Sequence, residues 1–195
     1  KREIPHFYLR KKVYVDKLLS ARKLLNKKLE IKNIKISIND FIIKAIAHAL
    51  HNHPKCNVTW GGDRIIKSSS TDIALAVAIE DGLVTPVIKN VKNKSLSDLS
   101  EETKLLIERS KNKRLRADEL VGGTITISNL GMMNVDNFDA IINPPNTSIL
   151  AVGCLKKIPI VKDDEIKIAK VINVTLSVDH RVLDGEIGAR FISEV

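Results

Sequence analysis

The sequence predicts one α/β domain built in two layers, with helices packed against a mixed β-sheet. Helix-like and strand-like apolar patterns alternate along the whole chain, and no repeat, low-complexity linker or shift in composition divides its 195 residues. This length suits a single domain with a sizeable hydrophobic core. With 44% apolar and 28% charged residues, the composition is typical of a soluble globular protein and not of a disordered one.

Four segments predict helices, of which the second is largely buried and the third is a polar surface helix. The first carries an apolar stripe and begins near Asp16, where a carboxylate caps the first turn or favours the helix dipole. The second follows Ser37, a preferred capping residue, and stops before Pro54. The predicted helices cover residues 15–30, 41–52, 97–113 and 186–195.

Shorter apolar segments between turn residues predict the strands. Residues 72–80 alternate Ile, Leu, Val and Ile with Ala between them, which is typical of a strand covered on both faces. A further strand is bent at Pro86, and Asp163-Asp164 joins two strands as a hairpin. The predicted strands cover residues 64–67, 72–80, 83–88, 124–128, 148–154, 158–162, 165–169 and 171–178.

The positive charge of the chain is concentrated at its N-terminus. Residues 1–35 contain 12 Lys and Arg against 3 Asp and Glu, whereas residues 36–195 contain 20 of each. A domain that binds nucleic acid over its surface would be basic throughout, and only 4% of residues are aromatic side chains able to stack on bases. The composition therefore argues against nucleic-acid binding, and the basic segment is suited to phosphates or to an acidic partner.

Membrane spans, disulfides and metal sites are not expected. The apolar runs are far shorter than the roughly 20 residues of a membrane helix, and no signal-peptide pattern opens the chain. Cys56 and Cys154 lie in unrelated contexts, so we expect reduced thiols in an intracellular protein. Three histidines between residues 48 and 53 match no strong zinc spacing, and no Asp or Glu lies among them to orient their rings.

Motifs for several common enzyme classes are missing from the sequence. Gly61-Gly62 and Gly122-Gly123 are isolated pairs and not phosphate-binding loops, so we interpret both as turns. The GxSxG motif of the serine hydrolases is also absent. A Rossmann, P-loop or α/β-hydrolase enzyme is therefore not predicted.

Residues 178–185, VDHRVLDG, place four ionisable side chains at the end of an apolar strand, where unpaired charges are costly. His180 is a candidate general base and Asp184 a carboxylate that orients it or supports its loop. Ser128, at the end of another predicted strand, is a candidate hydroxyl donor to an oxyanion. Together they suit acyl transfer. The alternatives are a polar cap between strand and helix for residues 178–185 and a turn-forming role for Ser128.

The segment DHRVLDG resembles the histidine signature of the dihydrolipoamide acyltransferases, the E2 cores of 2-oxo acid dehydrogenase complexes. Its looser His-x-x-x-Asp-Gly part is shared with chloramphenicol acetyltransferase, whose two-layer fold the resemblance implies. Further segments resemble the E2 family in the same order. They are residues 4–9, 38–45, 81–88 and 124–153. The resemblance covers residues 1–195 as an E2 catalytic domain truncated at both ends, without the lipoyl and peripheral-subunit-binding domains.

Within this family, SNLGM followed by VDNFDAIINPP looks most like the pyruvate dehydrogenase type, which transfers acetyl groups. Two departures concern fine substrate or partner specificity. Met133-Asn134 stands where Phe-Gly is more usual, and the stretch after HFYL, residues 10–12, is more basic than usual.

The resemblance implies that an acetyl group passes between a lipoyl thiol and coenzyme A without an acyl-enzyme. His180 then matches the general base and Ser128 the donor that stabilises the oxyanion. Asp184 matches the family's carboxylate, which either contacts the imidazole or supports the loop through an ion pair with Arg181. For Arg181 itself we favour the role of a strand-end anchor. Thr85 and Asn129 match segments that contact the substrates.

The same resemblance implies the partners and the setting. Coenzyme A is a substrate, the lipoamide is carried on a separate lipoyl domain, and no metal takes part. The subunits form a homotrimer whose active sites take Ser and His from different subunits, and trimers assemble into a large cage. The E1 and E3 components bind through domains missing from residues 1–195. The location expected is an organelle in a eukaryote and the cytoplasm in a bacterium.

Other assignments remain open at this point. A non-catalytic scaffold of the E3-binding core type would tend to lose the catalytic histidine, which is present here. An antibiotic acetyltransferase would use a small alcohol acceptor and form no cage. An acyltransferase of the succinyl or branched-chain type would differ only in the acyl group.

Overall fold

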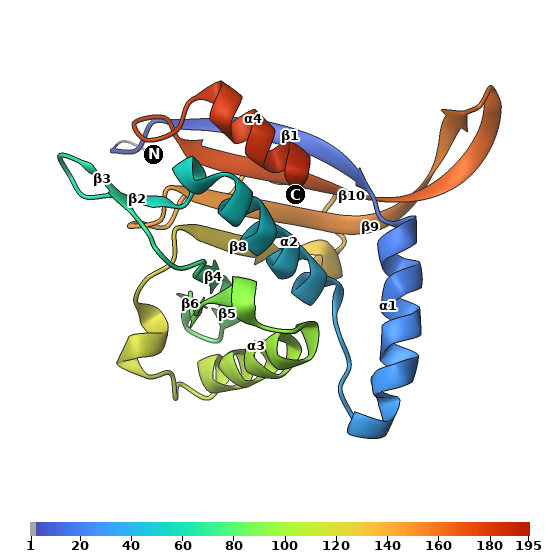
Figure 1. Ribbon diagram of the computed structural model, residues 1–195, viewed down its shortest axis with the longest axis horizontal. Helices are drawn as coiled ribbons and strands as arrows, with labels where there is room; N and C mark the ends of the chain where they lie inside the picture. Colours follow the sequence, from blue (N-terminus) through green and yellow to red (C-terminus); the bar gives the residue numbers. More distant parts are fainter. Residues whose placement is uncertain (1–2) are drawn as a thin grey trace.

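The structure is a computed structural model that describes residues 3–195 and has the predicted mixed α/β architecture. Helices α2 and α4 lie on one face of a central sheet, and α3 packs against α2 (Figure 1). The helices are α1 (Asp16–Leu29), α2 (Ile38–Asn52), α3 (Leu96–Lys111) and α4 (Gly185–Glu194). The strands are β1 (His6–Tyr14), β2 (Val58–Trp60), β3 (Ile65–Lys67), β4 (Ile73–Leu75), β5 (Val77–Ile79), β6 (Gly82–Val84), β7 (Val87–Ile88), β8 (Ile125–Asn129), β9 (Ser148–Lys162) and β10 (Glu165–Asp179).

The central sheet has six strands in the order β1-β10-β9-β8-β4-β7. Strand β8 runs parallel to β4 and β9, and the other pairs are antiparallel, so the sheet is mixed as predicted. Two small hairpins, β2-β3 and β5-β6, lie outside it. The side chains of Ile43, Leu50, Ile127, Leu176 and Phe191 form the buried core between the sheet and helices α2 and α4.

Several predicted strand boundaries were wrong. Residues 72–80 form two strands, β4 and β5, on either side of Ala76. The Ala76 N–H still donates to β8 in the central sheet, whereas β5 leaves this sheet and pairs with β6. Residues 83–88 are likewise divided between β6 and β7. In contrast, β9 and β10 are continuous strands of 15 residues each, joined at the predicted Asp163-Asp164 turn. Strands β1 and β2 were not predicted.

The predicted helices begin and end close to where their capping signals place them. Ser37 caps α2: its hydroxyl accepts the Asp40 N–H at 3.1 Å, and the Asp40 carboxylate accepts the Ser37 N–H at 2.7 Å. This reciprocal pair satisfies two backbone donors that the helix leaves free. Asp16 begins α1, where its carboxylate accepts the Lys170 N–H of β10 at 2.9 Å.

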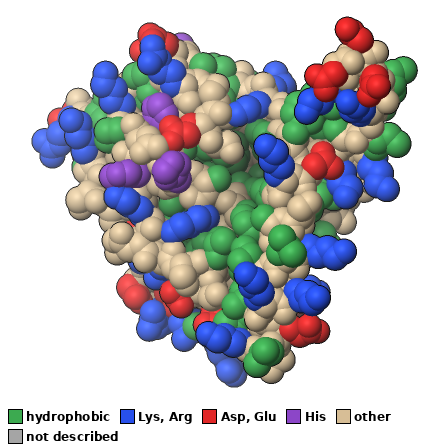
Figure 2. Space-filling view, turned by 45° about the vertical axis from the view of Figure 1, so that its right-hand side comes forward, with side chains coloured by type: hydrophobic (Ala, Val, Ile, Leu, Met, Phe, Trp, Pro, Cys, Tyr) green, Lys and Arg blue, Asp and Glu red, His purple; other side chains and the backbone are tan. Residues whose placement is uncertain are grey.

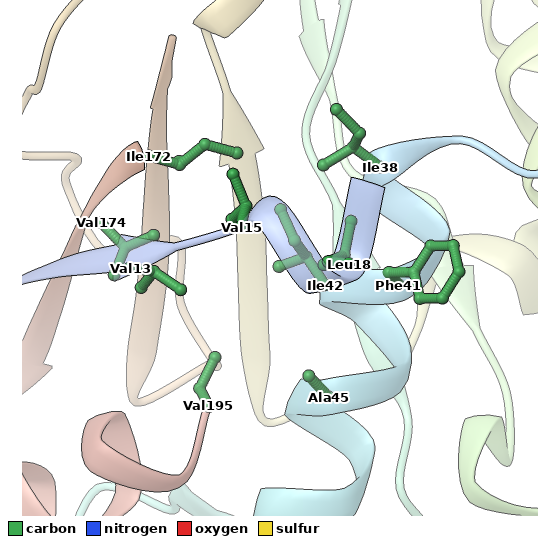
Figure 3. A pocket seen from close by; sticks show the side chains of 10 residues that line it. All are labelled: Val13, Val15, Leu18, Ile38, Phe41, Ile42, Ala45, Ile172, Val174 and Val195. Carbon is green, nitrogen blue, oxygen red and sulfur yellow. The ribbon is translucent and has the colours of Figure 1, made fainter. Parts of the chain in front are cut away.

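Helix α1 packs loosely against the rest of the domain. All of its residues remain at least partly exposed. A small apolar pocket lies where α1 meets α2 and β10, and Leu18, Ile42 and Val174 line this pocket with others (Figure 3). Figure 2 shows Lys and Arg side chains in this region next to apolar ones. Within the described part of the basic N-terminal segment, residues 10–12 lie on β1, and Lys17, Arg22, Lys23, Lys27 and Lys28 lie on this exposed helix.

Residues 157–162 of β9 and residues 165–170 of β10 form a two-stranded arm that projects from the body (Figure 1). The cross-strand pairs Val161–Ile166 and Pro159–Ile168 place four apolar side chains on one face of the arm. Val161, Ile166 and Ile168 are between 76% and 80% exposed. An isolated two-stranded hairpin is at best marginally stable in water, so this apolar face is costly where it remains uncovered.

Candidate active site

His180 lies in the turn that follows β10 and is held there by β1. Its backbone N–H donates to the Pro5 carbonyl at 2.9 Å, which extends the β1–β10 pairing by one residue. Its imidazole packs on Phe7, with ring centroids 4.7 Å apart and planes tilted by 51°. His180 is otherwise exposed, so its ring is held by the chain on one side and accessible on the other.

Asp179 and Arg181 stabilise this turn on either side of the histidine. Asp179 is 1% exposed, and its carboxylate accepts from Arg181 Nε at 3.0 Å, from the second guanidinium nitrogen at 2.7 Å and from the Arg181 backbone N–H at 3.0 Å. The guanidinium also lies 5.0 Å from the Trp60 ring centroid. These hydrogen bonds with Asp179 raise the pKa of Arg181. A buried carboxylate with a bidentate arginine is a strong anchor.

Arg181 is therefore the strand-end anchor that the sequence analysis favours, and the ion pair with Asp184 that it left open is not formed, because Arg181 pairs with Asp179. The Asp184 carboxylate is used elsewhere: Oδ1 accepts the Ile187 N–H at 3.0 Å, so Asp184 is the N-cap of α4. A carboxylate is favoured there by the capping hydrogen bond and by the helix dipole. Asp184 thus determines where α4 begins after the histidine turn.

Cys56 lies near the N-terminal end of α4, and its thiol is protonated near neutral pH. Its sulfur is 4.0 Å from the Ile187 carbonyl oxygen, and the side chain is buried. Burial, followed by the negative charge of Asp184, raises the pKa of this thiol to about 12. Cys56 and Cys154 are both free and buried.

Ser128 and Asn129 end strand β8, as predicted, and both are half-buried. The Asn129 side chain joins this end of the sheet to α2: Nδ2 donates to Asn39 Oδ1 at 2.5 Å, and Oδ1 accepts the Gly131 N–H at 2.7 Å. Thr85, between β6 and β7, accepts a hydrogen bond at 3.1 Å from Asn143 in the loop that leads to β9.

Within one chain, Ser128 and His180 lie far apart. Ser128 pairs with Ala151 and Ala151 with Thr175, whereas His180 lies five residues beyond Thr175. At about 3.3 Å per residue and about 4.8 Å per strand, this separation is about 16 Å along the sheet and about 10 Å across it, or about 19 Å in all. One chain therefore does not bring these two candidate residues together.

The two side chains also belong to different faces of the sheet. Side chains alternate along a strand, so Ser128 shares the face of Thr126, which Asn146 contacts at 2.6 Å. His180 follows on the face of Val178, which is buried beneath the helices with the core. Asp184 and the histidine turn thus lie at one end of the sheet, and Ser128 with Asn129 lies at the other.

Sequence reasoning missed three residues that hold the histidine turn in place. Phe7 packs on the imidazole, and Trp60 packs on Arg181. His6 links β1 to the loop before β9, because Nδ1 lies 2.7 Å from the Ile4 carbonyl oxygen and Nε2 accepts the Ile142 N–H at 3.0 Å. Aromatic residues in the strands beside the histidine would have been the signal, had β1 and β2 been recognised.

Two further histidines, His48 and His53, join the end of α2 to α4. His53 Nε2 is 2.6 Å and His48 Nε2 3.5 Å from the Glu194 carboxylate, which Asn52 also contacts. The Asn52 hydrogen bond and then the His53 contact lower the pKa of Glu194. In residues 3–195, no three His, Cys, Asp or Glu side chains are arranged to hold a metal ion. No helix in the same residues is long and apolar enough to cross a membrane.

The whole chain, residues 1–195, matches the family model described as 2-oxoacid dehydrogenases acyltransferase (catalytic domain). The chain belongs to this acyltransferase family. A dihydrolipoyllysine-residue acetyltransferase component of pyruvate dehydrogenase complex from Rickettsia felis is 50% identical over 194 residues, which are 99% of this chain and 47% of that protein. This acyltransferase chain spans about half the length of the curated relatives it matches.

Solved structures have the same fold as this acyltransferase chain. The dihydrolipoamide acetyltransferase (E2p) of Azotobacter vinelandii has a TM-score of 0.95 at 30% identity and covers 99% of this chain and 80% of its own. It comes from a study of a serine, a histidine and an asparagine in the catalytic mechanism of that enzyme. The cubic core of the pyruvate dehydrogenase multienzyme complex gives the same four values. A chloramphenicol acetyltransferase, 15% identical with a TM-score of 0.64, shares the fold alone.

Proposed function

We propose that this chain is the catalytic domain of a dihydrolipoamide acetyltransferase and transfers an acetyl group between a lipoyl thiol and coenzyme A. The observation that carries the proposal is the histidine turn, in which β1, a buried ion pair and a capped helix hold one accessible imidazole. The relatives described as pyruvate dehydrogenase acetyltransferase components support acetyl as the acyl group.

The spacing of the candidate residues supports their roles. In the Azotobacter enzyme, the serine and histidine under study are 52 residues apart, and the asparagine follows the histidine by four. Ser128 and His180 are also 52 residues apart, and Asp184 follows His180 by four. This equal spacing supports a correspondence of the three positions, with Asp184 in place of an asparagine.

His180 acts as general base on the incoming thiol. A free thiol has a pKa of about 8.5, so most of it is protonated near neutral pH and weakly nucleophilic. Imidazole accepts that proton as the sulfur attacks the thioester carbonyl. The tetrahedral intermediate then expels the other sulfur, which takes the proton back from the imidazolium. The reaction runs in both directions without a covalent bond to the chain.

Ser128 donates a hydrogen bond to the oxyanion of the tetrahedral intermediate. Removal of one such donor typically lowers kcat by about 10² to 10³. Asp184 supports the histidine turn as a helix cap and does not take part in proton transfer. Asn129, held by Asn39, and Thr85 contact the substrates near Ser128, and no metal is needed for any step.

Two copies of the chain build each active site. The separation of about 19 Å and the opposite faces of Ser128 and His180 support a site shared between subunits. The exposed apolar face of the β9–β10 arm supports such an assembly, because the arm leaves the sheet at the Ser128 end and would be covered by a neighbouring copy. We infer a homotrimer that assembles further into a cage, like the cubic core to which the chain is similar.

Other parts of the proposal concern the protein beyond residues 1–195. The lipoamide is carried on a separate lipoyl domain, and the E1 and E3 components bind through domains outside this range. The protein works inside the cell, in the cytoplasm of a bacterium or an organelle of a eukaryote. Neither nucleic acid nor a membrane is a partner.

A thiol-acceptor assay on the full-length protein tests this function. Acetyl, succinyl and branched-chain acyl-CoA donors are compared with dihydrolipoamide as the acceptor. We expect transfer from acetyl-CoA to exceed the others, and His180→Ala to abolish it while the assembly sediments unchanged. Near-normal turnover of His180→Ala would remove His180 from the role of base. Absence of transfer with every donor would favour a non-catalytic core protein.

A further inference from the structure

We propose that Phe7 is a positioning residue for His180, and that Gly188 makes room for it; this inference rests on the proposed role of His180 as base. Phe7 belongs to β1 and Gly188 to α4, so neither lies in the histidine turn itself. Together they hold one face of the imidazole and leave the other face open to substrate.

The strand register explains why Phe7 meets the imidazole. Phe7 pairs directly with Val178, and His180 follows Val178 by two residues, so both side chains extend from the same face of the β1–β10 pair. The centroid distance of 4.7 Å is within the range in which aromatic rings attract each other. The Pro5 carbonyl fixes the His180 backbone on the same strand.

Gly188 allows α4 to lie directly over this aromatic contact. A Cβ atom at position 188 would lie 2.9 Å from Leu9 Cδ1 and 3.6 Å from Phe7 Cζ. The first contact would require the flexible end of Leu9 to shift, whereas the second is an ordinary van der Waals contact, so glycine lets α4 approach both side chains without displacing either. Phe7 is therefore held from above by the helix that Asp184 caps.

The contact matters because the imidazole is otherwise exposed. The hydrogen bonds of the turn that hold His180 involve its backbone, and the Phe7 ring is what packs on its side chain. Without that ring the imidazole would sample other rotamers, and a base must lie within hydrogen-bond reach of the thiol proton. A misplacement of about 1 Å can lower the rate by about 10²-fold.

The test compares Phe7→Leu, which removes the ring and keeps apolar volume, with Phe7→Tyr, which keeps the ring. Tyr14→Leu is the matched control, because it likewise replaces an aromatic ring by leucine, at the far, exposed end of β1. We expect Phe7→Leu to lower kcat by about tenfold to a hundredfold with the KM for coenzyme A within about twofold of wild type. Phe7→Tyr should keep kcat near the wild-type value, and Gly188→Ala should change it less than Phe7→Leu does, because the end of the Leu9 side chain can shift.

A second measurement reports the position of the imidazole without reference to activity. Diethyl pyrocarbonate modifies accessible imidazoles, and mass spectrometry gives the rate at His180. That rate should rise several-fold in Phe7→Leu and stay unchanged in Tyr14→Leu. If the rate and kcat of Phe7→Leu both match wild type, the inference is wrong. If the rate rises but His180→Ala remains active, Phe7 positions the ring and the proposed base is wrong instead.

Discussion

Asp184 is predicted to act through its capping hydrogen bond and not through its charge. Asp184→Ala removes the acceptor for the Ile187 N–H, now at 3.0 Å, whereas Asp184→Asn keeps it. Loss of an N-cap costs about 1 kcal/mol, and Asn ranks with Asp as a cap. For a domain of this size, about 1 kcal/mol corresponds to about 2–4 °C in the thermal midpoint. We expect that decrease for Asp184→Ala and little change for Asp184→Asn.

Thermal unfolding at fixed protein concentration measures these shifts, and the acetyl-transfer assay measures activity in the same samples. Asp63→Ala serves as control, because Asp63 is an exposed carboxylate outside any helix cap. It should change the midpoint by less than about half of the Asp184→Ala effect. If Asp184→Asn loses as much stability and activity as Asp184→Ala, the charge matters and the capping explanation is wrong.

Three further predictions concern Cys56, Arg181 and Glu194. With a pKa of about 12, only roughly 10⁻⁴ of the Cys56 thiol is ionised at pH 8. Cys56 should therefore resist iodoacetamide in the folded protein and react when the protein is unfolded. Rapid labelling of Cys56 in the folded protein would contradict the raised pKa. Arg181→Ala leaves the buried Asp179 carboxylate without its ion-pair partner. We expect the free energy of unfolding, measured by denaturant titration, to fall by about 3 kcal/mol. A loss below about 1 kcal/mol would mean that the pair behaves as an exposed one. Because the folded-state pKa of Glu194 is lowered from 4.5, its contribution is complete above that value and is lost as the pH falls through the lower one. Glu194→Gln should therefore weaken the acid dependence of the thermal midpoint and the Glu186→Gln control should not; equal curves for all three proteins would exclude the contribution.

Local signals in the sequence predicted the helices well. Ser37 and Asp40 form the capping box that begins α2, and the apolar stripe and Asp16 placed α1 correctly. Asp163-Asp164 predicted the hairpin, because two turn residues between apolar runs act over a few positions. These elements depend on neighbours in the sequence, so their boundaries could be deduced from it.

Features that depend on distant pairing could not be predicted. Strand β1 owes its conformation to β10, about 170 residues away, and its basic residues obscure any alternation. The sequence favours Arg181 as a strand-end anchor, but it does not say that the anchor is a bidentate ion pair with the buried Asp179 carboxylate. The contact of Phe7 with His180 follows only from the register of that pair of strands.

A mixing experiment tests most directly whether Ser128 and His180 act together from different subunits. Ser128→Ala and His180→Ala chains are co-expressed so that mixed trimers form, and acetyl transfer is compared with each variant alone. In a shared site, an intact serine from one chain meets an intact histidine from another, so random mixing should restore about a quarter of wild-type activity. If mixing gives only the average of the two inactive variants, each site is built within one chain and the shared site is wrong.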